Sequence, residues 1–122
     1  MQTHADHLLP QIIGMHWIVD QANNNPQSPY YHHLDTAHIG AAGHSFGGLA
    51  TSMVGSDPHI FAIATMAGAS ATPMLHEPAL FMCGGMDTTV PCSNIQTAFD
   101  YVTSTPVMLE EDPTASHGSW CC

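Results

Sequence analysis

Lysine and arginine are absent from this sequence of 122 residues, which contains ten acidic residues and ten histidines. Average domains are about 25% charged and roughly half of that is basic, so about a dozen lysines and arginines are expected. Without fixed cations the surface should repel nucleic acid and anionic membranes, and it has no clamp for nucleotide phosphates. Carboxylates can pair only with histidine, backbone N–H groups or a metal ion. The net charge should change widely between about pH 5 and 7, where histidines titrate.

Long apolar runs are missing too, although 44% of the residues are hydrophobic. No run approaches the roughly 18 residues that a membrane span needs, so we expect no membrane-spanning segment. The first residues do not place a basic segment before an apolar one, so no signal peptide is predicted. The length suits one domain, residues 1–122, with a modest core.

No Cys-x-x-Cys pair occurs, so a zinc knuckle is not expected. The four cysteines are Cys83, Cys92, Cys121 and Cys122, and three complete pairings are possible. We favour a bridge from Cys121 or Cys122 to Cys92. Cys83 lies in an apolar run and is alternatively a small buried residue without a partner.

Short apolar runs alternate with stretches of helical periodicity along the whole chain. The pattern predicts helices over residues 6–22, 45–54 and 91–101, and buried strands over 38–42, 60–67, 79–83 and 106–109. Pro10 would be tolerated only in the first turn of its helix. Strands that alternate with helices form βαβ units. The predicted fold is therefore α/β, a mostly parallel sheet of about four strands with flanking helices on both faces.

Gly43-His44-Ser45-Phe46-Gly47 has the G-x-S-x-G pattern of a nucleophile elbow, between an expected strand and an expected helix. The serine must sit on a sharp turn so that its hydroxyl projects above the sheet edge. Gly43 and Gly47 are expected to permit that turn, because a Cβ at either would collide with neighbouring backbone. The N–H of Phe46, at the helix N-terminus, is the expected oxyanion donor. A plain glycine turn between strand and helix is the alternative.

A serine needs a base, and the base needs an orienting carboxylate. Asp87 follows the third expected strand and His117 follows the fourth, in the chain order serine, acid, histidine. Because parallel strands end at one edge of their sheet, these side chains should meet Ser45 there. We predict Ser45 as nucleophile, His117 as base and Asp87 as orienting acid.

Other residues compete for some of these roles. Glu110 and Asp112 are alternative partners for His117, although they are close to it in sequence. His44 is expected to pack beside or orient the site, and it is grouped with Phe46 and Trp120 as a candidate for oxyanion or substrate binding. Phe46 and Trp120 are candidates for lining a substrate pocket, or for ordinary packing.

About two thirds of the chain, residues 35–120, resembles the C-terminal half of bacterial α/β-hydrolases of the cutinase, polyester-hydrolase and dienelactone-hydrolase kind. The matching segments are DTAHIGAAGHSFGG (35–48), ALFMCGGMDTTVP (79–91) and ASH (115–117). The resemblance implies a carboxylic-ester hydrolase that forms an acyl-serine and needs no cofactor. Its substrate would be a small-molecule or polymeric ester, and the resemblance alone favours an extracellular location.

The chain also departs from that family. Only about four strands are predicted, a truncated α/β-hydrolase fold, and the N-terminal strands that usually supply a second oxyanion donor have no counterpart. The first strand would leave an exposed sheet edge through which copies of the chain could form a homo-oligomer. The alternative function is therefore a catalytically weak or silent fragment that acts as a folding or oligomerisation module.

The histidines suggest a third function, metal binding. His4 and His7 have helical i, i+3 spacing, and His32 and His33 are adjacent. Neither pair has the full ligand set of a zinc site, so no metal site is predicted.

Overall fold

Four parallel strands form one sheet in the computed structural model, which describes residues 5–72 and 75–121. The strands lie in the order in which they occur in the chain: β1 (Ile39–His44), β2 (Ile60–Met66), β3 (Ala79–Gly84) and β4 (Val107–Asp112). The helices are α1 (Ala5–Asn24), α2 (Phe46–Val54), α3 (Cys92–Tyr101) and the short 3₁₀ helix η1 (His117–Trp120). The predicted α/β class with a parallel sheet is confirmed.

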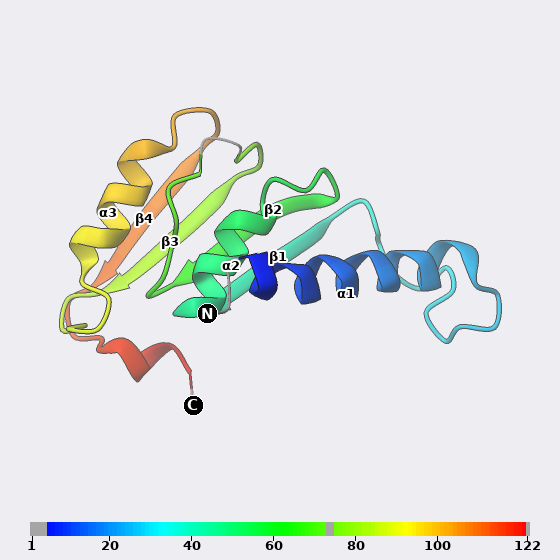
Figure 1. Ribbon diagram of the computed structural model, residues 1–122, viewed down its shortest axis with the longest axis horizontal. Coiled ribbons are helices and arrows are strands. Elements are labelled where there is room, and N and C mark those ends of the chain that lie inside the picture. The colour runs from blue at the N-terminus through cyan, green and yellow to red at the C-terminus, as the bar shows by residue number, and fades with distance from the viewer. Residues whose placement is uncertain (1–4, 73–74, 122) are drawn as a thin grey trace.

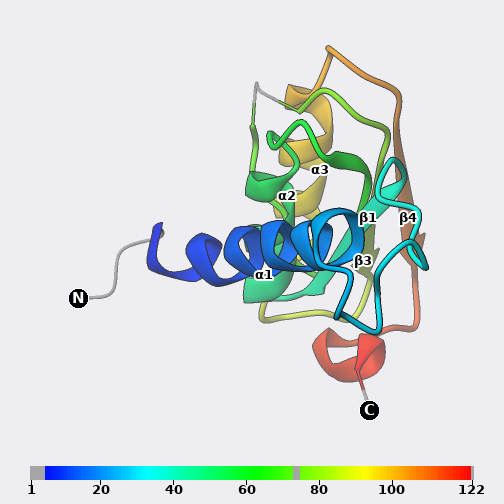
Figure 2. The same ribbon diagram turned by 90° about the vertical axis from the view of Figure 1, so that its right-hand side faces the viewer.

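The three α-helices all lie on one face of this sheet (Figure 2). α2 connects β1 to β2 and α3 connects β3 to β4, and both connections step in the same direction across the sheet. Crossovers of one hand that step in one direction place their helices on the same face. The expectation that helices cover both faces is therefore wrong, and Figure 1 shows α1 extending beyond the β1 edge of the sheet instead.

The core fills the space between the sheet and these helices. Alternate strand residues supply it, because successive side chains point to opposite faces. Its fully buried members come from the strands, α3 and the loop before β3: Ile60, Ile63, Leu75, Ala79, Phe81, Cys83, Ile95, Ala98 and Val102.

The other face of the sheet is apolar and uncovered. Leu80 pairs with Ala64 on one side and with Met108 on the other, so all three point away from the core. Met108 is 64% exposed. Ala62, Leu80 and Met108 also line a shallow apolar groove on this side. Among the described residues, no helix combines the length and apolar character that crossing a membrane requires.

Some boundaries differ from those predicted. β4 continues to Asp112, three residues past its expected end at residue 109. Pro10 lies inside α1, beyond the first turn of a helix that begins at Ala5. Both differences from the prediction fall on exposed parts of the chain, at Pro10 and at the last three residues of β4.

The disulfide joins Cys83, near the end of β3, to Cys92, the first residue of α3. Their Cα atoms lie 5.2 Å apart, within the usual range for a bridge. The favoured pairing of Cys92 with Cys121 or Cys122 is therefore wrong. Cys121 has an exposed free thiol, and Cys122 lies outside the described residues.

Candidate active site

Ser45 lies between the carboxyl end of β1 and the first residue of α2. Its backbone is in the left-handed half of conformational space, with φ 54° and ψ −118°. Such a conformation costs about 1–3 kcal/mol in a non-glycine residue and persists only where the surroundings fix it. The Ser45 N–H donates to the Met66 carbonyl (2.9 Å), and the Ser45 carbonyl accepts the N–H of Leu49 (3.1 Å). The sharp turn of a nucleophile elbow is therefore present and anchored on both sides.

Close backbone packing explains most of the glycines around this turn. A Cβ on Gly43 would run into the backbone of Gly47, and one on Gly48 into the backbone of Gly68. Gly68 in turn lies directly against the backbone of Ser45. A Cβ on Gly47 would meet nothing within 4 Å, so the expected collision there is wrong. The residue that the turn requires within α2 is Gly48.

The hydroxyl of Ser45, the imidazole of His117 and the carboxylate of Asp87 form one continuous chain of hydrogen bonds. His117 Nε2 lies 2.8 Å from Ser45 Oγ, and His117 Nδ1 lies 2.7 Å from Asp87 Oδ2. The three residues follow the carboxyl ends of β1, β3 and β4. The His117 side chain is 23% exposed, whereas that of Asp87 is fully buried. The structure thus brings together the three predicted side chains, with the imidazole accessible from solvent.

The Asp87 carboxylate is held by backbone as well as by His117. Its Oδ1 accepts the N–H groups of Thr89 and Val90, both at 2.8 Å. Burial alone would raise the pKa of Asp87, but hydrogen bonds from the Val90 N–H, His117 and the Thr89 N–H outweigh it and hold the pKa below its usual value. An ionised carboxylate only accepts, so His117 donates from Nδ1 and presents the lone pair of Nε2 to the Ser45 hydroxyl.

The loop that carries Asp87 is tied directly to the loop that carries His117. The N–H of Met86 donates to the Ala115 carbonyl (3.0 Å), and that of Gly85 donates to the Asp112 carbonyl (2.8 Å). Gly84 lies so close to Ala115 that a Cβ there would strike its backbone. These contacts fix Asp87 relative to His117. In the sequence, the adjacent glycines Gly84 and Gly85 were the signal for these close contacts between the two loops, and the prediction of the site did not rest on them.

His44 contacts His117 rather than Ser45 Oγ. Its Nε2–H donates to the backbone carbonyl of His117 (2.7 Å), and the two rings lie 4.9 Å apart at a tilt of 48°. This geometry agrees with a residue that positions His117. Its assignment to oxyanion or substrate binding remains a prediction.

Phe46 and Trp120 flank the hydrogen-bonded residues along the chain. Phe46 is the first residue of α2 and is 52% exposed. Trp120 ends η1, the short helix that begins at His117, and is half-buried. The indole N–H of Trp120 is buried without a hydrogen-bond partner among the described residues. The hollows between α1 and β1 and on the uncovered face are not lined by Ser45, Asp87 or His117.

The competing acids are engaged in other contacts. Asp112 Oδ1 accepts both the N–H and the hydroxyl of Thr114, each at 2.8 Å. These two hydrogen bonds hold the pKa of Asp112 below its usual value. Glu110 is exposed. In the described part of the chain, the carboxylate at His117 Nδ1 is that of Asp87.

The histidine pairs noted in the sequence do not form a ligand cluster among the described residues. His32 stacks on Tyr31 with ring centroids 3.9 Å apart, and the side chains of His4 and His7 lie outside the described part. Two other groups bring possible metal ligands together. The first consists of Cys83, Cys92 and Glu111, whose two sulfurs are already joined in the disulfide; the second consists of His16, Asp57 and His59.

No protein-family model matches the chain, and a search of curated proteins finds no match. The case for a function therefore rests on the fold, on the strained turn at Ser45 and on the hydrogen bonds that link Ser45 to His117 and Asp87.

Proposed function

We propose that this protein is a serine hydrolase that cleaves carboxylic esters through an acyl-serine intermediate. The observation that carries the proposal is the unbroken hydrogen-bond chain from Asp87 through His117 to Ser45, with distances of 2.7 and 2.8 Å. Such a chain activates a hydroxyl, because the imidazole accepts the proton and the carboxylate stabilises the resulting imidazolium.

The reaction follows from the position of each atom. Ser45 Oγ attacks the ester carbonyl carbon while its proton moves to His117 Nε2, giving a tetrahedral oxyanion. As the oxyanion collapses, the C–O bond breaks and the alcohol leaves with the proton from Nε2. Water then attacks the acyl-serine while one of its protons moves to Nε2, giving a second tetrahedral oxyanion. As this oxyanion collapses, the bond between the acyl carbon and Ser45 Oγ breaks, Oγ regains the proton from Nε2, and the carboxylic acid is released. Asp87 stays ionised throughout.

The oxyanion needs hydrogen-bond donors at the same rim. The proposed donor is the backbone N–H of Phe46, at the positive end of α2. Loss of one donor from an oxyanion hole typically lowers kcat by about 10²–10³-fold. If Phe46 supplies the only donor, catalysis will be slower by about that factor than with a complete pair.

Charge and exposure indicate the substrate class. The chain has a formal net charge of −10 and no lysine or arginine, so no fixed cation attracts an anionic substrate. Phe46 and Met86, which are 52% and 64% exposed, adjoin Ser45 and Asp87 in the sequence and offer apolar contacts. The proposed substrate is a neutral ester.

Turnover and covalent labelling test this function. The protein should hydrolyse p-nitrophenyl butyrate and react with a fluorophosphonate probe, with the label located on Ser45 by mass spectrometry. Ser45→Ala should abolish both. Ser56→Ala is the matched control, because Ser56 is exposed and its hydroxyl only donates to the nearby Met53 carbonyl. Turnover that survives in Ser45→Ala would refute the proposal.

The uncovered apolar face favours a second candidate, a catalytically weak or silent module that assembles with copies of itself. Leu80 and Met108 lie on that face, and β1 and β4 are the two edges of the sheet. A folded wild-type protein that neither turns over the ester nor takes the label, but elutes as an oligomer in size-exclusion chromatography, would support this candidate instead.

A further inference from the structure

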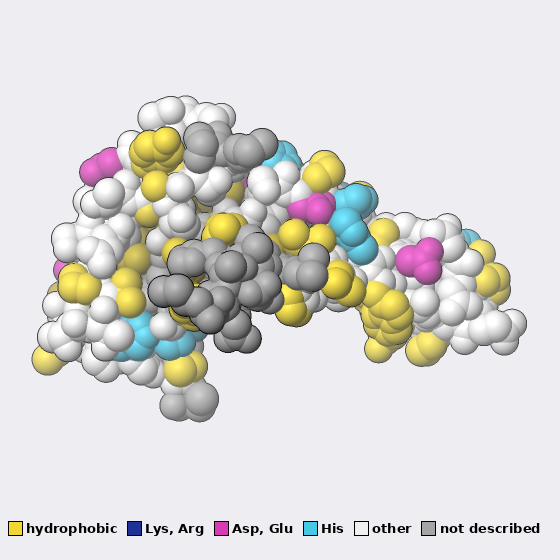
Figure 3. All heavy atoms as spheres, in the orientation of Figure 1, with side chains coloured by type: hydrophobic (Ala, Val, Ile, Leu, Met, Phe, Trp, Pro, Cys, Tyr) yellow, Lys and Arg dark blue, Asp and Glu magenta, His cyan; other side chains and the backbone are white. Residues whose placement is uncertain are grey.

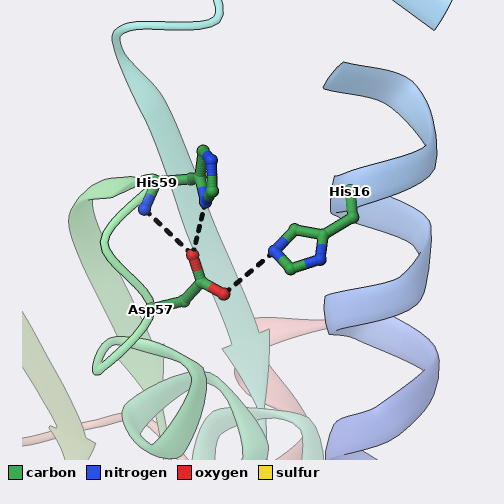
Figure 4. A group of neighbouring side chains, drawn as sticks. All are labelled: His16, Asp57 and His59. Carbon is green, nitrogen blue, oxygen red and sulfur yellow. Dashed lines mark hydrogen bonds and ion pairs between the residues drawn. The ribbon is translucent and has the colours of Figure 1, made fainter. Parts of the chain in front are cut away.

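A cluster of three side chains that can ligate a metal lies at the opposite end of the strands from Ser45. His16 comes from α1, whereas Asp57 and His59 come from the turn between α2 and β2 (Figure 4). His16 Nε2 lies 3.1 Å from Asp57 Oδ2, and His59 Nδ1 lies 2.8 Å from Asp57 Oδ1. All three ligand atoms lie within 4.8 Å of one another, and both rings point toward the carboxylate.

The carboxylate at the centre of the cluster is fixed in place. The side chain of Asp57 is only 12% exposed, and its Oδ1 also accepts the backbone N–H of His59 at 2.9 Å. The Asp57 N–H donates to the Val54 carbonyl, and the Asp57 carbonyl accepts the N–H of Ile60. Burial would raise the pKa of Asp57, but hydrogen bonds from the His59 N–H, the His59 ring and the His16 ring hold it below its usual value. The site therefore presents a carboxylate ligand in a rigid turn.

The two imidazoles can adjust around that carboxylate. The His16 side chain is 50% exposed and that of His59 is 46% exposed, so rotation of either ring disturbs little packing. A tetrahedral ion with bonds of about 2.0–2.1 Å needs its ligand atoms about 3.3 Å apart. The two imidazole nitrogens face different oxygens of Asp57, at 3.1 and 2.8 Å, and the three ligand atoms lie within 4.8 Å of one another. Small ring rotations would bring them to that spacing, and the ion would displace the ring protons that are shared with Asp57.

We propose that His16, Asp57 and His59 form a binding site for a divalent transition-metal ion, with zinc as the ion that fits the ligands best. Two imidazole nitrogens and one carboxylate oxygen are ligands that Zn²⁺ takes, whereas Ca²⁺ and Mg²⁺ prefer oxygen alone. Water completes the coordination on the exposed side. The formal net charge of −10 favours a cation, and no lysine or arginine competes for Asp57.

Bound zinc would join α1 to the turn before β2. His16 belongs to α1 and is 41 residues from Asp57 in the sequence, so the ion would close a long loop. Loops closed at long separation restrict the unfolded chain more than short ones. The site is a structural clamp on α1, at the opposite end of the strands from the proposed active site, and it takes no part in ester hydrolysis.

Other exposed histidines provide matched controls. His38 lies 2.6 Å from Asp35 and His76 lies 3.0 Å from Glu77, so each pair has one imidazole and one carboxylate. Neither belongs to a cluster of three ligand atoms in the described residues. A variant of His38 removes an imidazole from an acidic neighbour without touching the proposed site.

The test is a titration of the full chain with Zn²⁺ by calorimetry, with thiols blocked by alkylation. His16→Ala and His59→Ala should each weaken the affinity by about tenfold or more, because each removes a ligand. His38→Ala should bind like wild type. Zinc should raise the Tm of wild type and of His38→Ala but not that of the two site variants, and circular dichroism will show whether these variants are folded. His16→Gln, which keeps a polar side chain, should behave like His16→Ala.

Two results would overturn the proposal. One is equal Zn²⁺ affinity in wild type, His16→Gln and His59→Ala, which would place the binding on other histidines. The other is a wild-type affinity for Zn²⁺ that is less than ten times the affinity of the double variant without His16 and His59. Because Co²⁺ reports ligand type by its absorption, a Co²⁺ spectrum with nitrogen and oxygen ligands that is lost in His59→Ala would independently support it.

Discussion

Replacing Asp87 with asparagine tests whether the carboxylate sets the tautomer of His117. The backbone N–H groups of Thr89 and Val90 both donate to Asp87 Oδ1, so in Asp87→Asn that position must keep the amide oxygen. The amide nitrogen then occupies the place of Oδ2, which lies 2.7 Å from His117 Nδ1. An NH₂ group donates, so Nδ1 must become the acceptor and the ring proton moves to Nε2.

The consequence for catalysis is large because Nε2 faces the nucleophile. With a proton on Nε2, 2.8 Å from Ser45 Oγ, the imidazole can no longer accept the proton of the attacking hydroxyl. The equivalent change in a serine protease lowers kcat by about 10⁴-fold. Asp87→Asn should therefore lose about 10⁴-fold in kcat for p-nitrophenyl butyrate near pH 7, with KM little changed.

The control for this prediction is Asp112→Asn, which alters an acid on the same rim that bonds to Thr114 rather than to His117. Its kcat should stay within about threefold of wild type, as expected of a surface substitution away from the reacting groups. Thermal unfolding of both variants separates a catalytic effect from loss of the fold. If folded Asp87→Asn keeps kcat within tenfold of wild type, the orienting role of Asp87 is wrong.

The remaining predictions concern stability. Gly43→Ala should lower the free energy of unfolding, measured in urea, by about 1–3 kcal/mol because its Cβ strikes the backbone of Gly47. Gly47→Ala should raise the free energy of unfolding by about 0.5–1 kcal/mol, because its Cβ meets nothing. Equal effects of the two substitutions would contradict this packing. Burial raises the pKa of Glu77, so the stability that this group contributes is present at low pH and is lost as pH rises through its folded-state pKa. Glu77→Gln should thus gain stability relative to wild type between about pH 4 and 7, and a pH-independent difference would refute this. Reduction of the Cys83–Cys92 disulfide, which links residues nine apart, should cost about 2–3 kcal/mol; an unchanged Tm with reductant would contradict it.

The elements of the fold could be predicted because short apolar runs and helical periodicity are local properties. The end of β4 could not be predicted in the same way. Glu110, Glu111 and Asp112 continue that strand at the edge of the sheet, where all three are exposed and no apolar residue is needed. The face covered by the helices depends on the order of the strands, which is a tertiary property that no local pattern encodes.

The candidate site was predictable because each of its residues lies in the segment that follows a strand. Ser45, Asp87 and His117 could be placed on one edge because parallel strands end together. The cluster that contains His16 could not be found in this way, since it depends on how α1 docks, 41 residues from Asp57. The disulfide was missed for a related reason: the loop after β3 turns back and brings Cys92 beside Cys83.

Histidine is the partner in every ion pair of the described residues. On the face shown in Figure 3, an acidic side chain lies against histidine near the middle of the molecule. These ion pairs differ in the role that the imidazole plays. Asp57 and Asp87 each accept backbone N–H groups, which help to keep both carboxylates ionised when the histidines are neutral. A neutral imidazole has a free lone pair, which the proposed ester hydrolysis requires at His117 and the proposed metal site requires at His59. The backbone hydrogen bonds to the two aspartates thus let a chain without lysine or arginine keep its anions ionised while its histidines remain available for chemistry.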